Sequence, residues 1–204
     1  MDGGYDSGYR ACPCFWGRDP GKLVRKLVNE IPEFRGVRAL DVGCGEGKNA
    51  AFLAACGAAV TAIDISEVAI EHATRLWSDG LHIEWRVEDV RRMAPPKDSY
   101  DIVIAYGLLH CLNSKAEVQS TVARLQNCTK PNGYHALAAL NVRHQDLKAH
   151  PNLKPCLLDH VEYASLYTGW CCLWVEDAEL HEIHPDTQIP HTHSLTRILA
   201  RKPA

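Results

Sequence analysis

The chain has 204 residues, of which 46% are apolar and 23% are charged, and its formal net charge is −3. This composition is that of an ordinary globular protein and excludes a disordered chain, a collagen-like fibre and a coiled coil. It has neither a basic run nor 18 consecutive apolar residues, so we expect neither dedicated nucleic-acid binding nor a membrane-spanning helix.

The first 18 residues are rich in Gly, Tyr and Cys and are predicted to form an irregular lid. Asp19 and Pro20 are then typical of a helix start, as N-cap and first helical residue, and Pro32 would end that helix. The polar, acidic beginning of the chain lacks the basic and apolar regions of a signal peptide. A cytoplasmic protein with reduced thiols is therefore expected.

Strand and helix patterns alternate along most of the remaining chain. The predicted strands are 37–42, 59–63, 83–87, 102–105, 133–140, 170–175 and 194–199. The predicted helices are 49–56, a segment capped by Ser66, and 114–128. A turn is expected at 131–133. Residues 141–169 are less regular and are interpreted as an insertion on the substrate side.

This alternation is typical of an α/β protein with an open, mostly parallel sheet and helices on both faces. The whole chain is predicted to form a single domain. In such sheets ligands bind at the carboxyl ends of the strands. The glycines after the first strand, Asp64 after the second and Tyr106 after the fourth are all expected at that edge.

The segment from Asp41 to Gly47, DVGCGEG, lies between a predicted strand and a predicted helix. Its glycines permit a tight turn and close approach of a ligand, and Asp64 could accept hydrogen bonds from ribose hydroxyls. A dinucleotide site requires G-x-G-x-x-G, whereas Lys48 stands where the third glycine is needed. Asp41 would also repel a pyrophosphate. The pattern therefore favours an adenosine cofactor with a positive charge over NAD.

Four segments in the expected order resemble the motifs of class I S-adenosylmethionine-dependent methyltransferases: LDVGCGEGKN, VTAIDIS, VEDV and YDIVIAYGLLHCL. The resemblance implies a Rossmann-like sheet of seven strands with an antiparallel last strand. More narrowly, residues 43–73 and the ending LTRILARK resemble tellurite-resistance-type methyltransferases. Glu182 stands where that family has an Arg, which argues against oxyanion substrates such as tellurite.

The resemblance also assigns a cofactor role to particular residues. Asp41, Gly43, Cys44 and Gly45 would hold the methionine part of S-adenosylmethionine, and the carbonyl of Ala105 would accept from its amino group. The residues implied at the ribose and adenine are Asp64, Ile65, Asp89 and Val90.

Further candidates come from residue chemistry near the predicted pocket. His110 could be a base or orient the acceptor, and Tyr106 could form a wall of the pocket. Tyr5, Tyr9 and Trp16 could close over the sulfonium as an aromatic lid, with Trp16 as the main contact. Two basic residues are also candidates. Arg18 could pair with the cofactor carboxylate, and His181 could contact the acceptor.

We expect no metal site, because His181, His184, His191 and His193 have no partner at a familiar ligand spacing. Of the nine cysteines, Cys12 and Cys14 are the candidates for reaction with a soft thiol, chalcogen or metalloid substrate. The prediction is methyl transfer to a small molecule by a monomer or homodimer. The soft-substrate enzyme, a non-catalytic cofactor-binding subunit and an NAD-dependent oxidoreductase are the alternatives.

Overall fold

The computed structural model describes residues 4–77, 80–150 and 152–204. The strands are β1 (Arg38–Val42), β2 (Ala59–Asp64), β3 (Ile83–Val87), β4 (Tyr100–Tyr106), β5 (Thr129–Gln145), β6 (Cys171–Glu182) and β7 (His191–Arg201). The helices are α1 (Asp6–Ala11), α2 (Lys22–Val28), α3 (Lys48–Ala55), α4 (Glu67–Leu76), the 3₁₀ turn η1 (Leu109–Cys111), α5 (Lys115–Cys128) and α6 (His160–Ser165).

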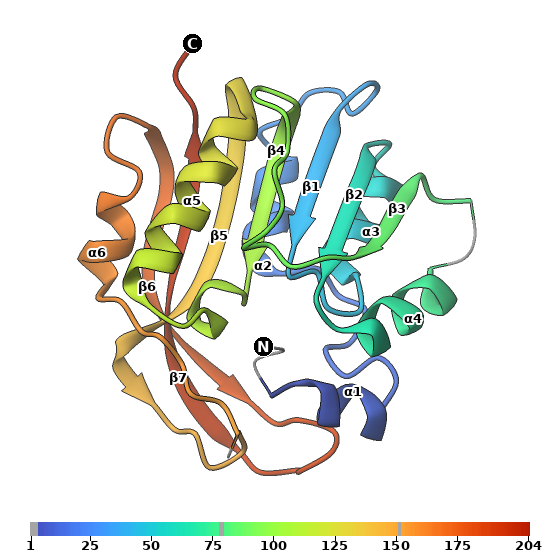
Figure 1. Ribbon diagram of the computed structural model, residues 1–204, viewed down its shortest axis with the longest axis vertical. Helices are drawn as coiled ribbons and strands as arrows, with labels where there is room; N and C mark the ends of the chain where they lie inside the picture. Colours follow the sequence, from blue (N-terminus) through green and yellow to red (C-terminus); the bar gives the residue numbers. More distant parts are fainter. Residues whose placement is uncertain (1–3, 78–79, 151) are drawn as a thin grey trace.

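All seven strands join one sheet in the order β3-β2-β1-β4-β5-β7-β6 (Figure 1). The first five of these strands pair in parallel, and β7 runs antiparallel to both β5 and β6. The predicted α/β class and the Rossmann-like sheet with an antiparallel last strand are confirmed. The order of strands changes direction between β1 and β4, which is where such sheets place their ligands.

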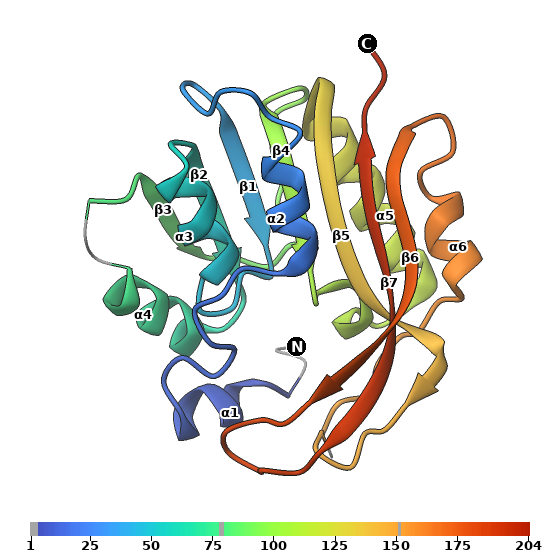
Figure 2. The same cartoon turned by 180° about the vertical axis from the view of Figure 1, so that it is seen from behind.

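Helices cover both faces of the sheet (Figures 1 and 2). On one face Val118, Val122 and Leu125 of α5 pack with Tyr163 of α6 against the central strands. On the other face Leu23 and Leu27 of α2 and Leu53 of α3 form a second core layer. Among the described residues, no helix combines the length and the apolar character needed to cross a membrane.

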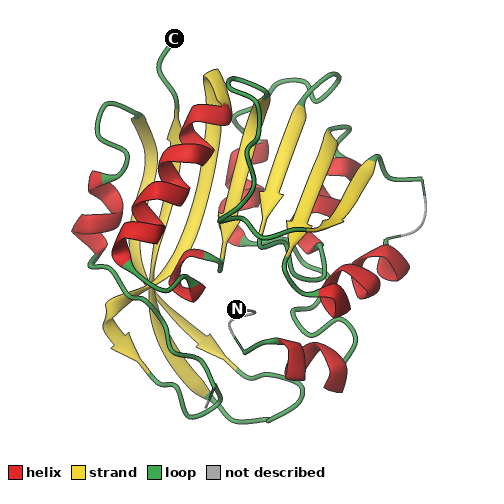
Figure 3. Ribbon diagram, viewed as in Figure 1, coloured by secondary structure: helices red, strands yellow, loops and turns green. Residues whose placement is uncertain are grey.

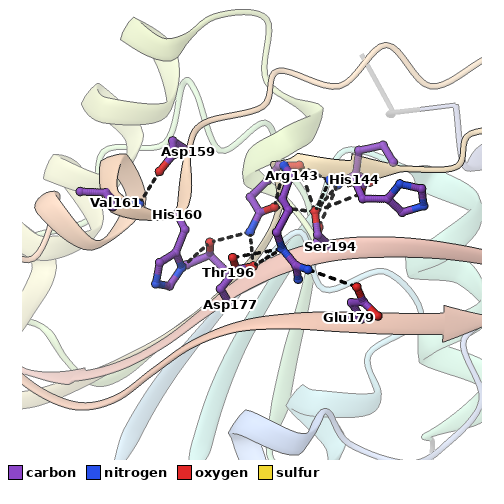
Figure 4. A network of polar contacts seen from close by, with 11 residues as sticks. Arg143, His144, Asp159, His160, Val161, Asp177, Glu179, Ser194 and Thr196 are labelled. Atoms are coloured by element: carbon purple, nitrogen blue, oxygen red, sulfur yellow. Dashed lines mark hydrogen bonds and ion pairs between the residues drawn. The ribbon is translucent and has the colours of Figure 1, made fainter.

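The last three strands extend beyond the rest of the sheet and curve under the carboxyl ends of β1 and β4 (Figure 3). A polar network ties this extension together (Figure 4). Arg143 of β5 lies 3.1 Å from the carboxylates of Asp177 and Glu179 of β6, and the backbone N–H of His144 donates to Ser194 Oγ of β7 at 2.8 Å. These contacts join the three strands of the extension to one another.

Several local predictions need correction. The helix expected from Asp19 and Pro20 begins at Lys22, because Gly21 is its N-cap and Asp19 instead pairs with Arg25 at 2.9 Å. The turn expected at 131–133 lies within β5, where Asn132 adopts φ +63° beside a shift in the β4–β5 register.

Two segments that were predicted to be irregular contain regular structure. Residues 1–18 include the helix α1. The proposed insertion at 141–169 starts inside β5 and includes α6, whose Tyr163 is fully buried in the core. The predicted strand 170–175 starts one residue before β6, and the predicted strand 194–199 lies within β7. Both observed strands are longer than predicted because they continue into the extension.

Candidate active site

A cavity opens at the carboxyl ends of β1, β2 and β4, between the sheet, α1 and the curved extension of β6 and β7. Its floor is the turn from Gly43 to Lys48. Gly45 has φ +54°, and a Cβ there would lie 3.0 Å from the hydroxyl of Tyr9. Gly47 has φ +81°, and its Cβ would lie 2.2 Å from the ring of Trp85. Glycine is therefore required at both positions, as the motif predicts.

Asp64 closes β2 at the wall of this cavity. Its Oδ2 accepts the Gly45 N–H at 2.8 Å, and its Oδ1 accepts the Ser66 N–H at 2.9 Å. Burial raises the pKa of this carboxyl, and the two N–H groups act in the opposite direction. The two hydrogen bonds fix the carboxylate while each oxygen keeps acceptor capacity for a ligand.

Asp41 lies in β1 directly before the glycine turn and is 1% exposed. Burial, followed by the nearby charge of Asp64, raises the pKa of Asp41 to about 8. Its Oδ2 has no hydrogen-bond partner among the described residues. A buried carboxyl oxygen that lacks a partner is costly unless a donor or a positive charge reaches it, which fits the cationic end predicted for the cofactor.

Ile65, Asp89 and Val90 line the part of the cavity beyond Asp64. Ile65 is 37% exposed and offers an apolar surface for a ring. The guanidinium of Arg91 binds Asp89 at two points, Nε to Oδ1 at 2.9 Å and Nη2 to Oδ2 at 2.7 Å, which lowers the pKa of Asp89. Asp89 therefore stays ionised and is held in place at the predicted adenine position.

Aromatic side chains of the N-terminal segment cover the glycine turn. Tyr5, Tyr9 and Trp16 all line the cavity, and the indole N–H of Trp16 donates to the Tyr9 hydroxyl at 3.2 Å. The Trp16 ring also lies edge-on to His184, with the ring centroids 5.2 Å apart. The structure thus places all three lid candidates over the cavity and links them to the loop after β6.

Tyr106 and His110 lie on the side of the cavity away from Asp64. The Tyr106 ring packs against Gly21, where a Cβ would lie 2.5 Å from it. His110 is 3% exposed, and burial lowers its pKa to about 3. Its Nδ1 accepts the Leu140 N–H at 3.3 Å, whereas its Nε2 is buried without a partner among the described residues. His110 is therefore a neutral imidazole whose Nε2–H is available to donate.

Not every predicted site residue reaches the cavity. Asp41 in β1 and Ala105 in β4 are both buried and do not line the cavity. Arg18 does not line it either, and its guanidinium lies over the ring of Trp77 at 5.3 Å. His181 points to the other side of β6, where its Nδ1 meets Thr192 Oγ1 at 2.9 Å in a separate shallow hollow. Cys12 also lies outside the cavity lining, as does Cys14.

The cavity is also lined by residues that were not predicted from the sequence to belong to the site. The chief examples are Lys48, His150, Glu182 and His193. The Lys48 ammonium donates to the Trp16 carbonyl at 3.0 Å, and burial lowers its pKa. Alternation along β6 could have pointed to Glu182, because neighbours on a strand face opposite sides and His181 faces outward.

Comparisons with known proteins agree with this geometry. A family model described as "Methyltransferase domain" matches residues 39–133. The chain is 29% identical over 175 residues to "Ubiquinone biosynthesis O-methyltransferase" of Rickettsia prowazekii, which covers 82% of this chain and 64% of that protein. The match therefore spans somewhat less than two thirds of that relative.

The chain is therefore similar in sequence to methyltransferases, in agreement with the resemblance of its motifs. Solved structures share the methyltransferase fold. TehB from Haemophilus influenzae has a TM-score of 0.72 at 20% identity, covering 88% of this chain and 61% of that one. NodS from Bradyrhizobium japonicum, in complex with S-adenosyl-L-homocysteine, has a TM-score of 0.69 at 15% identity over the full length of both chains.

Proposed function

We propose that this protein is a class I S-adenosylmethionine-dependent methyltransferase and transfers the methyl group of S-adenosylmethionine to an oxygen of a small molecule bound beside Tyr106 and His110. The observation that carries the proposal is a single cavity with two different ends. The glycine turn and Asp64 form the cofactor end, and the neutral His110 with its unpartnered Nε2 forms the other end.

The residues at the first end fit the cofactor. Asp64 would accept the ribose hydroxyls, and Ile65 and Val90 would contact the adenine. Asp41 does not line the cavity, but its buried, unpartnered oxygen lies directly before the glycine turn and would favour the cationic methionine part. The bound cofactor supplies a sulfonium methyl group, which is already activated for in-line displacement. The protein then has to hold the acceptor about 3–3.5 Å from that methyl group and exclude water.

His110 is suited to orient the acceptor. Because its pKa is about 3, the imidazole is neutral at pH 7, and because Nδ1 is occupied by the Leu140 N–H, the proton lies on Nε2. An N–H donor at this place would hold an acceptor oxygen by a hydrogen bond and leave a lone pair free for attack. Tyr5, Tyr9 and Trp16 would close the cavity around both ligands.

An oxygen acceptor is supported by the Rickettsia relative, which is named as an O-methyltransferase, and a small acceptor by the confinement of the cavity between the sheet, α1 and the extension. The soft-substrate alternative gains no support, since Cys12 and Cys14 do not line the cavity. The test is the release of S-adenosylhomocysteine with matched phenols, alcohols, amines and thiols. Turnover of a phenol or alcohol is expected. Turnover of thiols alone, or of no acceptor despite cofactor binding, would overturn the proposal.

A further inference from the structure

Four histidines gather beside the cavity, although they come from distant parts of the chain, and two of them, His150 and His193, line it. His150 lies in the loop after β5, His184 follows β6, and His191 and His193 belong to the start of β7. His150 Nε2 lies 3.0 Å from His184 Nε2 and 3.2 Å from His191 Nε2. Tetrahedral coordination with zinc–nitrogen bonds of about 2.0–2.1 Å places ligand nitrogens about 3.3 Å apart, close to both separations.

Hydrogen bonds at Nδ1 orient two of these imidazoles. His191 Nδ1 lies 2.8 Å from the carbonyl of Ile189, and His193 Nδ1 lies 2.8 Å from Gln145 Oε1. A carbonyl oxygen can only accept, so each Nδ1 carries the proton and each Nε2 presents a lone pair. Metal-binding histidines are held by this type of contact.

Two hydrogen bonds fix the Gln145 amide, which in turn orients His193. Gln145 Nε2 donates to the carbonyls of Asn141 at 2.7 Å and Ser194 at 2.8 Å. Its Oε1 is thereby directed at His193. The Nε2 of His193 is itself buried and has no partner among the described residues.

Hydrogen bonds among the three imidazoles cannot satisfy the cluster formed by His150, His184 and His191. His191 Nε2 is an acceptor, and His150 Nε2 faces both it and His184 Nε2. One proton on His150 can serve only one of these neighbours. If His184 donates to His150 instead, two lone pairs face each other at the His150–His191 contact. A cation at the centre would accept a lone pair from each of the three Nε2 atoms.

We propose that His150, His184 and His191 bind one divalent transition-metal ion, with Zn²⁺ the best-suited ion, at the wall of the cavity. Three imidazoles leave a coordination position open, as in catalytic zinc sites. His150 lines the cavity, and so do the neighbouring Glu182 and His193, which offer further ligand atoms within 4.8 Å of His191. The ion would therefore lie next to the ligand space.

The proposed metal site also indicates which chemical class of acceptor the protein methylates. This part of the inference rests on the proposed function. An ion at this wall would bind an acceptor through an ionised oxygen, such as a phenolate. Binding of the hydroxyl releases its proton to solvent, and the oxygen then forms its bond to the methyl group as the carbon–sulfur bond breaks and leaves a neutral thioether. The donor set is mainly imidazole and suits Zn²⁺ better than Mg²⁺, which prefers oxygen ligands.

The test uses the full chain without a histidine tag, stripped of metal and titrated with Co²⁺ and with Zn²⁺. One equivalent of Co²⁺ is expected to give the intense visible absorption of a four- or five-coordinate ion, and one equivalent of Zn²⁺ should displace it. His150→Gln and His184→Gln should each weaken binding by roughly 100-fold or more, while His82→Gln, at an exposed position, should not. Melting curves check that each variant folds.

A spectrum of six-coordinate Co²⁺, binding above millimolar concentrations only, or equal affinity in all variants would overturn the metal site. S-adenosylhomocysteine is titrated into the same stripped protein, so that loss of the cofactor site would be recognised separately. Addition of catechol to the Co²⁺ protein should then shift the visible bands. An unchanged spectrum would overturn the placement of the acceptor on the ion while leaving the ion itself in place.

Discussion

Replacing Asp64 by Asn tests the cofactor site at its best-defined group. The substitution keeps the shape of the side chain but removes its charge. In the native protein Oδ1 and Oδ2 each accept one backbone N–H, from Ser66 and Gly45, and the same two oxygens would accept the ribose hydroxyls. The Asn amide nitrogen can only donate, so one backbone bond and one ribose bond are lost.

The size of the effect follows from these contacts. A hydrogen bond to a charged group contributes about 1.5–3 kcal/mol, and about 1.4 kcal/mol corresponds to a factor of ten in affinity. We therefore expect Asp64→Asn to bind S-adenosylhomocysteine about 10- to 150-fold more weakly in isothermal titration calorimetry. The lost backbone bond should also lower the unfolding free energy by about 1 kcal/mol.

Asp101→Asn is the matched control. Asp101 also accepts a backbone N–H, from Arg38 at 2.9 Å, and pairs with Lys130, but it lies at the opposite end of β4 from the cavity. This variant should lose stability without losing cofactor affinity. Wild-type affinity in a folded Asp64→Asn protein, or equal losses in both variants, would refute the placement of the ribose.

Three further predictions concern the buried groups of the site. Because the pKa of Asp41 is about 8 when folded and about 3.8 when unfolded, the native state holds an extra proton between these values. The unfolding free energy of the wild type, measured in urea, should therefore fall as pH rises from 5 to 8. This fall should exceed the fall for Asp41→Asn by about 4 kcal/mol. Parallel curves for the two proteins would contradict this. Gly47→Ala should cost about 2–4 kcal/mol because its Cβ would overlap Trp85, whereas Gly36→Ala has a similar φ and open space and should cost less. His110→Asn should lower kcat/KM about 10- to 100-fold with unchanged S-adenosylhomocysteine affinity, and a matching loss of affinity would argue for a packing role.

The parts of the site that sequence reasoning predicted are local in the chain. The tight turn needs Gly45 and Gly47 because of their positive φ, and Asp64 follows from its place at the end of an apolar run. Such features depend on a few neighbouring residues and on the rule that parallel strands end at one edge. The cap of α4 by Ser66, whose Oγ accepts the Ala69 N–H at 3.1 Å, was predictable for the same reason.

The parts that were missed depend on distant segments. His150 meets His184 and His191 only because β5 continues past its predicted end and the β6–β7 hairpin curves beneath the sheet. Spacing between histidines within the hairpin could not show this. Similarly, Lys48 was considered only for its effect on the glycine pattern, whereas its ammonium reaches the lid at the Trp16 carbonyl.

The most direct test of the account is a crystal structure of the chain with S-adenosylhomocysteine. The account predicts the ribose hydroxyls on the Asp64 carboxylate, the adenine against Ile65 and Val90, and the sulfur directed toward the space beside Tyr106 and His110. A ligand bound outside this cavity, or with its ribose away from Asp64, would contradict it.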